Sequence, residues 1–203
     1  MRVAILPGSA RDNGNNQGMQ HWVAAAINNA GVAIGSSVDV VLGDLRKPPM
    51  ALGPVLDSVP AAGVKDPSKY GNEPTRTWST FVSSCDALVF VTPQYNYGYP
   101  GELKNALDHL YWEWQGKNVV VITYGGLGGV QCAEQLKQVL ERGLKMHIVG
   151  ALEVALPGPY IRESARVSVD AAGGFPDFLK ERQDDLDGAI SSLFEAAGKE
   201  SAK

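Results

Sequence analysis

The sequence predicts an α/β protein with a five-stranded parallel sheet, in the order 2-1-3-4-5, and helices on both faces. The first observation is an alternation of short apolar runs with segments whose apolar residues recur at helical spacing, which is typical of βα units in series. The second is that several runs are rich in Val and Ile without polar alternation, as in parallel strands buried on both faces. The third is length: 203 residues, 44% of them hydrophobic, can build one domain with a substantial core and are few for two.

Five apolar runs are the predicted strands, and they cover residues 3–6, 38–42, 87–92, 119–123 and 148–156. Five groups of apolar residues spaced three or four positions apart predict the main helices, and the third helix is expected to continue to Trp114. The groups are Met19, Trp22, Val23, Ala26 and Ile27; Trp78, Phe81, Val82 and Cys85; Leu103, Ala106, Leu107 and Leu110; Cys132, Leu136, Val139 and Leu140; and Leu186, Ala189, Ile190, Leu193 and Phe194. For five βα units the order 2-1-3-4-5 is a common arrangement, and it binds a ligand where the first and third strands end.

Two long loops interrupt this alternation without dividing the chain. Residues 43–74 contain six prolines, and residues 157–176 are rich in Gly and Pro. Loops of this length are usually functional or mobile, and neither separates two self-sufficient sets of strands and helices. We therefore expect one domain over residues 1–197, followed by a polar, frayed tail over residues 198–203.

Composition and charge narrow the classes of function. A net charge of −4 argues against nucleic acid as the main partner, because phosphate binding needs a basic surface. No apolar run is long enough to span a bilayer, and the chain enters its first strand without a signal-peptide pattern. Two cysteines do not form a disulfide framework, and no spacing of His, Cys and Asp resembles a zinc site. These features predict a cytoplasmic protein that binds no nucleic acid, membrane or metal.

The loop after the third predicted strand carries the most informative motif. Pro93, Gln94, Tyr95, Asn96 and Tyr97 follow the strand directly, and a helix-initiating proline comes three positions later. Ligands of open α/β sheets bind at the carboxyl ends of the strands, where this loop lies. Its aromatic faces, side-chain amides and exposed backbone suit a planar ligand such as a flavin ring.

Two further loops follow strands that neighbour the third one in the predicted order. After the first strand, Ser9 and Arg11 precede a helix whose N-terminus favours an anion, so that this loop could bind a phosphate. The alternative, which the residues alone leave open, is a loop that only caps the helix. After the fourth strand, Tyr124 precedes four glycines in five positions, which let a ligand approach the backbone or merely make the loop flexible.

Residues 93–108 match the pattern P-x-Y-N-x-x-x-P-x-x-L-K-N-A-[ILV]-D at every position. This motif, the other two loops and the helix start at residues 75–79 occur in the same order in a known family. In these features the chain resembles the NAD(P)H-dependent FMN reductases and quinone reductases of the flavodoxin-like superfamily, especially their small eukaryotic members. The resemblance implies a flavodoxin-like fold and FMN as the cofactor, with NADPH or NADH as co-substrate. It implies FMN contacts at Ser9, Arg11 and Asn16 for the phosphate, at Pro93, Gln94, Tyr95, Asn96 and Tyr97 for one edge and face of the ring, and at Tyr124, Gly125 and Gly126 for its pyrimidine side. Gly14 departs from the pattern, because many relatives have a hydrogen-bonding residue there.

The resemblance also implies a reaction. A hydride passes from the nicotinamide to flavin N5, two electrons then pass to a quinone or another acceptor in ping-pong order, and no side chain is expected to be catalytic. These relatives are typically homodimers or dimers of dimers, and the aromatic segment 111–114 would suit a subunit interface. Two alternatives remain open: a one-electron carrier of the flavodoxin type, and a flavin-dependent module that acts on a partner protein without catalysis.

Charged and titratable residues outside the three loops are weaker candidates. Arg46, Lys47, Arg162 and Arg166 lie in the two long loops and could contact the phosphate of the nicotinamide nucleotide, although charged loop residues are usually only solvated. The three histidines are expected to have structural or surface roles. Cys132 is expected to be a small buried residue rather than a reactive one.

Overall fold

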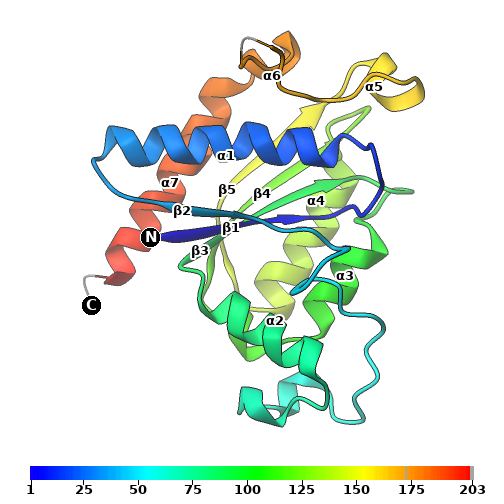
Figure 1. Ribbon diagram of the computed structural model, residues 1–203, viewed down its shortest axis with the longest axis vertical. Coiled ribbons are helices and arrows are strands. Elements are labelled where there is room, and N and C mark those ends of the chain that lie inside the picture. Colours follow the sequence, from blue (N-terminus) through cyan, green and yellow to red (C-terminus); the bar gives the residue numbers. More distant parts are fainter. Residues whose placement is uncertain (172, 202–203) are drawn as a thin grey trace.

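The computed structural model describes residues 1–171 and 173–201, and its sheet has the predicted order β2-β1-β3-β4-β5, with all strands parallel (Figure 1). The strands are β1 (Arg2–Pro7), β2 (Asp39–Leu42), β3 (Ala87–Pro93), β4 (Asn118–Gly125) and β5 (His147–Ala155). β3 is buried along its whole length and β1 and β4 are nearly so, whereas the edge strands β2 and β5 are partly exposed. This is the burial that Val- and Ile-rich runs predict for central parallel strands.

Two layers of helices cover the sheet (Figure 1). α1 (Asn16–Ala33) and α7 (Gln183–Ser201) lie together on one face, where α1 packs against β1, β2 and β3 and α7 packs against β4 and β5. α2 (Glu73–Ser83), α3 (Gly101–Asp108) and α4 (Val130–Lys137) lie on the other face. Each face of the sheet therefore has its own buried apolar core, built from side chains of the strands and from the apolar residues at helical spacing.

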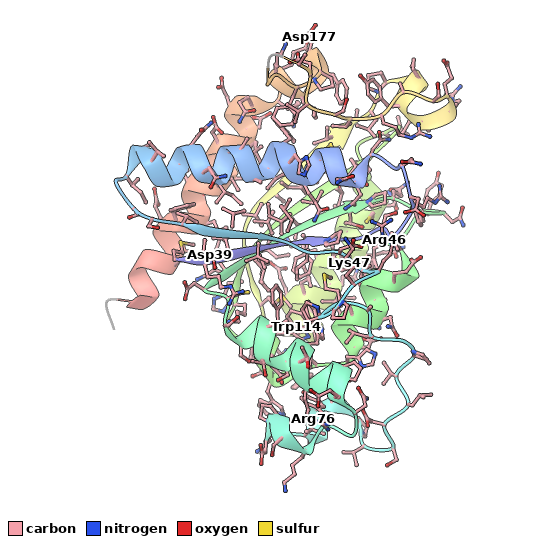
Figure 2. The ribbon with its side chains drawn as sticks, viewed as in Figure 1. Asp39, Arg46, Lys47, Arg76, Trp114 and Asp177 are labelled. Carbon is pink, nitrogen blue, oxygen red and sulfur yellow. The ribbon has the colours of Figure 1, made fainter. Side chains whose placement is uncertain are left out.

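The predicted continuation of α3 to Trp114 is wrong. In a continuing helix the carbonyl of Leu107 would accept a hydrogen bond from the amide of Tyr111. Instead, the indole Nε1 of Trp114 donates to that carbonyl (3.0 Å), and the amide of Tyr111 donates to the carboxylate of Glu113 (3.3 Å). The aromatic segment is a separate 3₁₀ turn, η3 (Trp112–Trp114), and its last side chain is fully buried between the sheet and α2 (Figure 2).

Besides η3, the connections that the structure describes contain five further short helical segments and one long anchored loop. The segments are η1 (Ala61–Gly63), η2 (Pro67–Lys69), the π-helical turn η4 (Gln138–Gly143), α5 (Gly158–Arg162) and α6 (Asp177–Lys180). Buried His109 ties the loop over residues 43–74 to two helices. Its Nε2 donates to the carbonyl of Gly53 (3.1 Å), which leaves Nδ1 to accept from Oγ1 of Thr75 (2.9 Å). Asn105 donates to the same carbonyl (2.7 Å), and the structural role expected of His109 is confirmed.

The C-terminal helix α7 reaches Ser201, and the frayed tail expected over residues 198–203 lies partly outside the described residues, at 202–203. Among the helices that the structure describes, none is both long and apolar enough to cross a bilayer. Within the same residues, no three His, Cys, Asp or Glu side chains gather as the ligands of a metal ion would.

Candidate functional site

Three loops meet at the carboxyl edge of the sheet, where β1, β3 and β4 end side by side (Figure 1). They are the β1–α1 loop (residues 8–15), the β3–α3 loop (residues 94–100) and the β4–α4 loop (residues 126–129). With the segment that follows β5, they enclose a cavity of roughly 250 Å³. This is the position that the strand order predicts for a ligand.

The β1–α1 loop is packed against β3 and its loop. Gly8 has no room for a side chain, since a Cβ would lie 1.9 Å from Oγ1 of Thr92. Ser9 Oγ lies 2.6 Å from the hydroxyl of Tyr95, and the guanidinium carbon of Arg11 lies 4.5 Å from the centre of the Tyr95 ring. Ser9, Arg11 and Tyr95 therefore form one cluster across two loops, and its hydroxyl and guanidinium groups suit an anion such as a phosphate.

The N-terminus of α1 points at this loop without a side-chain cap. The first amides of a helix have no partner within the helix. Asn15 occupies the N-cap position and makes no capping bond, and the first turn holds no acidic residue. The structure therefore does not show the capping loop that the sequence left open, and the amides and the helix dipole are available to an anion.

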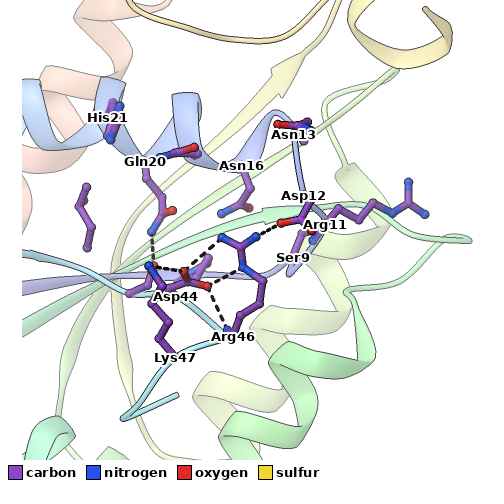
Figure 3. Close-up of a pocket in the computed structure, with 15 residues that line it drawn as sticks. Ser9, Arg11, Asp12, Asn13, Asn16, Gln20, His21, Asp44, Arg46 and Lys47 are labelled. Carbon is purple, nitrogen blue, oxygen red and sulfur yellow. Dashed lines mark hydrogen bonds and ion pairs between the residues drawn. The ribbon is translucent and has the colours of Figure 1, made fainter. Parts of the chain in front are cut away.

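Asn16, in the first turn of α1, is buried and oriented by Tyr124. The hydroxyl of Tyr124 donates to Asn16 Oδ1 (2.9 Å), and burial raises the pKa of Tyr124 well above its usual value, so that the hydroxyl keeps its proton. Among the residues that the structure describes, Nδ2 of Asn16 has no hydrogen-bond partner, and the side chain extends from α1 into the cleft of Figure 3. A buried amide with an unused donor suits a polar ligand atom.

The tip of the β3–α3 loop is a tight turn in an uncommon conformation. Tyr95 and Gly98 exchange backbone hydrogen bonds (2.8 and 2.9 Å), and Asn96 and Tyr97 between them have φ angles of 46° and 69°. Positive φ at two successive non-glycine residues is uncommon, and such conformations cluster at functional sites. The carbonyl of Tyr97 accepts from Nε2 of Gln135 (3.1 Å), while the Tyr97 side chain is 72% exposed. The turn therefore presents an aromatic ring at the carboxyl edge of the sheet.

Gln94 connects the β3–α3 loop to α4 and β4. Its side-chain Oε1 accepts from the backbone amide of Cys132 (3.2 Å), and the backbone amide of Gln94 donates to the carbonyl of Tyr124 (2.9 Å). Because Oε1 is engaged, Nε2 is the end of the Gln94 side chain that remains for a ligand. Gly129 in the neighbouring loop has a φ of 77°, and a Cβ there would lie 3.0 Å from Cβ of Thr123. This glycine is required by the turn itself.

A second cleft, of roughly 320 Å³, lies on the other side of the β1–α1 loop, toward β2 (Figure 3). The guanidinium of Arg46 bonds both carboxylate oxygens of Asp44 (3.0 and 3.2 Å) and pairs with Asp12 of the β1–α1 loop. The hydrogen bond from Arg46 lowers the pKa of Asp44 to about 2. Lys47 Nζ lies 3.7 Å from the same carboxylate. The cations that the sequence offers here for a nucleotide phosphate are already paired with carboxylates.

Comparison with known proteins decides the family. Residues 1–159, more than three quarters of the chain, match the family described as NADPH-dependent FMN reductase. The chain belongs to this family. It is therefore an oxidoreductase that uses FMN with NAD(P)H as the electron donor, and the choice between reductase and one-electron carrier is decided in favour of the reductase.

Two relatives and one solved structure are similar to this chain. The Saccharomyces cerevisiae protein named NAD(P)H-dependent FMN reductase LOT6 is 40% identical over 157 residues, which cover 77% of this chain and 82% of the yeast protein. A quinone reductase of Escherichia coli K12 is 42% identical over 65 residues, 29% of this chain and 35% of that protein. FerB, a flavoenzyme NAD(P)H:(acceptor) oxidoreductase from Paracoccus denitrificans, superposes with a TM-score of 0.60 over 98% of this chain and 97% of its own, at 20% identity. At this identity the similarity to FerB shows only a shared fold. The predicted flavodoxin-like fold is confirmed.

The residues present suit the FMN that this family uses. One end of the cavity combines a hydroxyl, a guanidinium and an uncapped helix, which match a phosphate. Seven of the predicted contact residues line the cavity: Ser9, Arg11, Pro93, Gln94, Tyr95, Tyr124 and Gly125. Asn16 lines the adjoining cleft, whereas Asn96, Tyr97 and Gly126 are exposed nearby and line neither space.

Sequence reasoning missed the segment that follows β5 as part of this cavity. Tyr160, Ile161 and Arg166 contribute to the lining, yet only Arg166 was considered, and for a different phosphate. The available signal was position, because this Gly- and Pro-rich loop leaves the carboxyl edge of the sheet beside the other three. Its residues alone do not indicate that it folds back onto α1.

Proposed function

We propose that the cavity holds FMN, with Ser9, Arg11 and Asn16 at the phosphate, residues 93–97 along one edge and face of the ring, and residues 124–126 at its pyrimidine side. The observation that carries this proposal is the convergence of the three predicted loops on one cavity beside the uncapped N-terminus of α1. When bound, FMN takes a hydride from the reduced nicotinamide and passes two electrons to the acceptor.

The phosphate end is arranged before a ligand binds. The bond between Ser9 and Tyr95 and the stacking of Arg11 on the same ring hold both side chains beside the start of α1. Arg11 supplies positive charge, while Ser9, the helix amides and Nδ2 of Asn16 supply hydrogen-bond donors. Side chains that already occupy their bound positions lose less conformational entropy when the ligand arrives.

The ring end offers donors and flat surfaces. Nε2 of Gln94 is the donor that its bond to Cys132 leaves unused, and it suits an acceptor atom on the polar edge of the ring. Gly125 has no side chain to separate its backbone from a ligand. These groups orient the ring and surround it with donors that stabilise negative charge, and none of them acts as an acid or base.

We propose that donor and acceptor occupy the same space in turn, which gives ping-pong kinetics. Both substrates would stack on the one face of the flavin ring that the loops leave exposed, so that the first must leave before the second binds. The name of the E. coli relative supports a quinone as the acceptor.

The remaining proposals concern organisation. We propose a single flavodoxin-like domain over residues 1–197, located in the cytoplasm and assembled as a homodimer or a dimer of dimers. In the aromatic segment expected at a subunit interface, Trp114 is fully buried, whereas Trp112 is 40% exposed and remains available for such a contact. Light scattering of the purified protein measures the assembly directly, and a monomer at micromolar concentration would contradict it.

Replacement of Arg11 by Ala tests the phosphate end. If Arg11 contacts the phosphate, the change should weaken FMN binding by about 1.5–3 kcal/mol, the range for hydrogen bonds to charged groups. Riboflavin, which lacks the phosphate, should bind the variant as it binds the wild type. Fluorescence titration of the apoprotein measures both affinities. Unchanged FMN affinity in the variant, or a wild-type protein that binds no FMN, would contradict the proposed site.

Steady-state kinetics test the reaction order and the acceptor. With NADPH or NADH varied at several quinone concentrations, double-reciprocal plots should be parallel if the two substrates alternate in one space. Intersecting lines would show that both substrates bind together. A panel of quinones, free flavins and ferric complexes identifies the acceptor, and slower turnover of quinones than of every other class would contradict the quinone proposal.

A further inference from the structure

The segment that follows β5 lies close to the start of α1 (Figure 1). We call residues 157–167 of this segment the strap; it contains α5 and leads on to α6. All but its first three residues lie beyond residue 159, where the match to the family ends. The contacts of the strap are therefore not part of what the family match describes.

Arg166 joins the strap to the β1–α1 loop. Its Nε donates to the carbonyl of Asn13 (2.6 Å), and its Nη1 donates to the carbonyls of Glu163 and Ala165 (2.8 and 2.6 Å). One guanidinium thus connects the turn of the strap with the loop. Asn13 has a φ of 52°, a left-handed conformation that non-glycine residues adopt at a cost in free energy. The bond to its carbonyl stabilises this conformation.

Asn15 makes a second connection, with both ends of its side-chain amide. Nδ2 donates to the carbonyl of Tyr160 (2.8 Å), and Oδ1 accepts from the amide of Val167 (3.0 Å). Because Oδ1 is engaged by the strap, it is not bonded to the amides of α1, which explains why the helix lacks its cap. The strap thereby leaves the first amides of α1 free for a phosphate.

Close packing gives a third connection, which does not depend on side-chain hydrogen bonds. A Cβ on Gly18 in α1 would lie 1.9 Å from the carbonyl oxygen of Val167, and this backbone atom cannot move aside without the strap. The side chain of Val167 is buried in the core between the sheet and α1. The strap is therefore packed against α1 and is not a loosely attached loop.

We infer that the strap is a positioning element for the phosphate of the cofactor, with Asn15 and Arg166 as positioning residues. This inference rests on the proposed function. The strap bonds hold the backbone of residues 13–15 and keep the first amides of α1 uncapped, and these are the groups nearest a phosphate at this cavity. The bonds of Asn15 and Arg166 involve none of the residues proposed for the ring, so the strap acts on the affinity for the phosphate.

Comparison of FMN with riboflavin in the apoprotein tests this inference, because the ratio of the two affinities reports the phosphate end alone. Arg166→Ala is expected to weaken FMN binding about tenfold, as for the loss of one hydrogen bond to a charged group, with riboflavin binding unchanged. Arg166→Lys should restore only part of the loss, because the ammonium group of lysine lacks the planar guanidinium with which arginine bonds three carbonyls at once. Arg162→Ala is the matched control, since it removes the same charge from an exposed position of α5. It should change neither affinity.

Gly18→Ala provides an independent variant. It removes no hydrogen-bonding side chain, yet the new Cβ must displace the strap, so the ratio of FMN to riboflavin affinity should fall as in Arg166→Ala. Gly188→Ala is its control, because a Cβ at that position in α7 meets no atom within 4 Å. The ratio should be unchanged in the control.

Amide hydrogen exchange in the apoprotein separates this inference from the proposed function. Exchange at residues 12–18 should be faster in Arg166→Ala and Gly18→Ala than in the wild type, while the buried strand β3 keeps its protection. Unchanged exchange and an unchanged affinity ratio in both variants would overturn the inference. A parallel loss of FMN and riboflavin affinity would overturn it as well, because that result indicates a general structural role. A wild-type protein that binds no FMN would overturn the proposed function instead, while faster exchange at residues 12–18 would still support the strap as the element that holds this loop.

Discussion

The side chains of the proposed site bond to one another across elements that are distant in the sequence. Tyr124 at the end of β4 donates to Asn16 at the start of α1, and Ser9 after β1 is bonded to Tyr95 after β3. Each bond joins a residue proposed for the phosphate to one proposed for the ring. These bonds hold the two ends of the site in a fixed relative position.

Replacement of Tyr124 by Phe keeps the ring and removes the donor to Asn16. Oδ1 of the buried Asn16 then loses its partner, which should lower the free energy of unfolding by about 1–3 kcal/mol. Urea unfolding measures this change. Tyr97→Phe, at a side chain that is 72% exposed, is the control and should stay within about 0.5 kcal/mol of the wild type. Equal stability of Tyr124→Phe and the wild type would show that the bond contributes nothing.

Cys132 is predicted to be unreactive in the folded protein. Burial raises the pKa of its thiol from 9.0 to about 12, so iodoacetamide at pH 8 should modify it only after unfolding. Since the folded-state pKa is the higher one, the stability that Cys132 contributes is complete below pH 9 and is lost as the pH rises toward 12. Unfolding at pH 8 and pH 10.5 should therefore show a larger decrease for the wild type than for Cys132→Ala. Rapid labelling of the native protein would contradict the buried position.

Single residues of the site were predictable where chemistry and position agreed. Ser9, Arg11 and Gln94 could be chosen because polar groups follow strands that end at one edge of the sheet. The bond between Tyr124 and Asn16 was not predictable, because it depends on the distance between α1 and β4 in the folded chain. Asn15 could not be told from an ordinary capping residue, since its partners lie more than 140 positions away.

At the scale of elements, helix ends and long loops are determined by tertiary contacts. α3 ends where the indole Nε1 of Trp114 donates a hydrogen bond to the carbonyl of Leu107. The loop over residues 43–74 is anchored where His109 and Asn105 share the carbonyl of Gly53. These contacts connect the loop that follows β2 with the helix that follows the proposed ring-binding turn.

Replacement of Asn105 by Ala should loosen that loop without unfolding the protein. The carbonyl of Gly53 keeps its hydrogen bond from His109 (3.1 Å) and loses the shorter one from Asn105 (2.7 Å). The free energy of unfolding should therefore fall by about 0.5–1.5 kcal/mol. Amide exchange should accelerate around residues 51–57. Lys104→Ala on the same helix, which removes only an exposed pair with Asp108, is the control. Equal exchange in the two variants would mean that Asn105 does not anchor the loop.

Strands were predictable to within two residues, because runs of Val and Ile between polar loops leave few alternatives. The end of α3 was not, because the apolar spacing continues past Asp108 through Leu110 and gives no sign that Trp114 competes for a backbone carbonyl. α5 and α6 were also missed. They are too short to show a period, and they are held by a contact between the rings of Tyr160 and Phe178 that joins one to the other.

At the scale of the whole molecule, strand order places the site. With β1 between β2 and β3, the loops after β1, β3 and β4 meet at one edge, and the segment after β5 completes the cavity. The fold and three of the four walls follow from the order of the apolar runs. The fourth wall, the strap, does not, because its path depends on the close approach of Val167 to Gly18.

We propose that FMN occupies the cavity at this edge, with its phosphate at the start of α1. A crystal structure of the protein with FMN shows where the cofactor lies. The phosphate is expected within hydrogen-bond distance of Ser9, Arg11 and the first amides of α1, and the ring between the loops after β3 and β4. Density for FMN in the cleft at Arg46, or at any other surface, would contradict it.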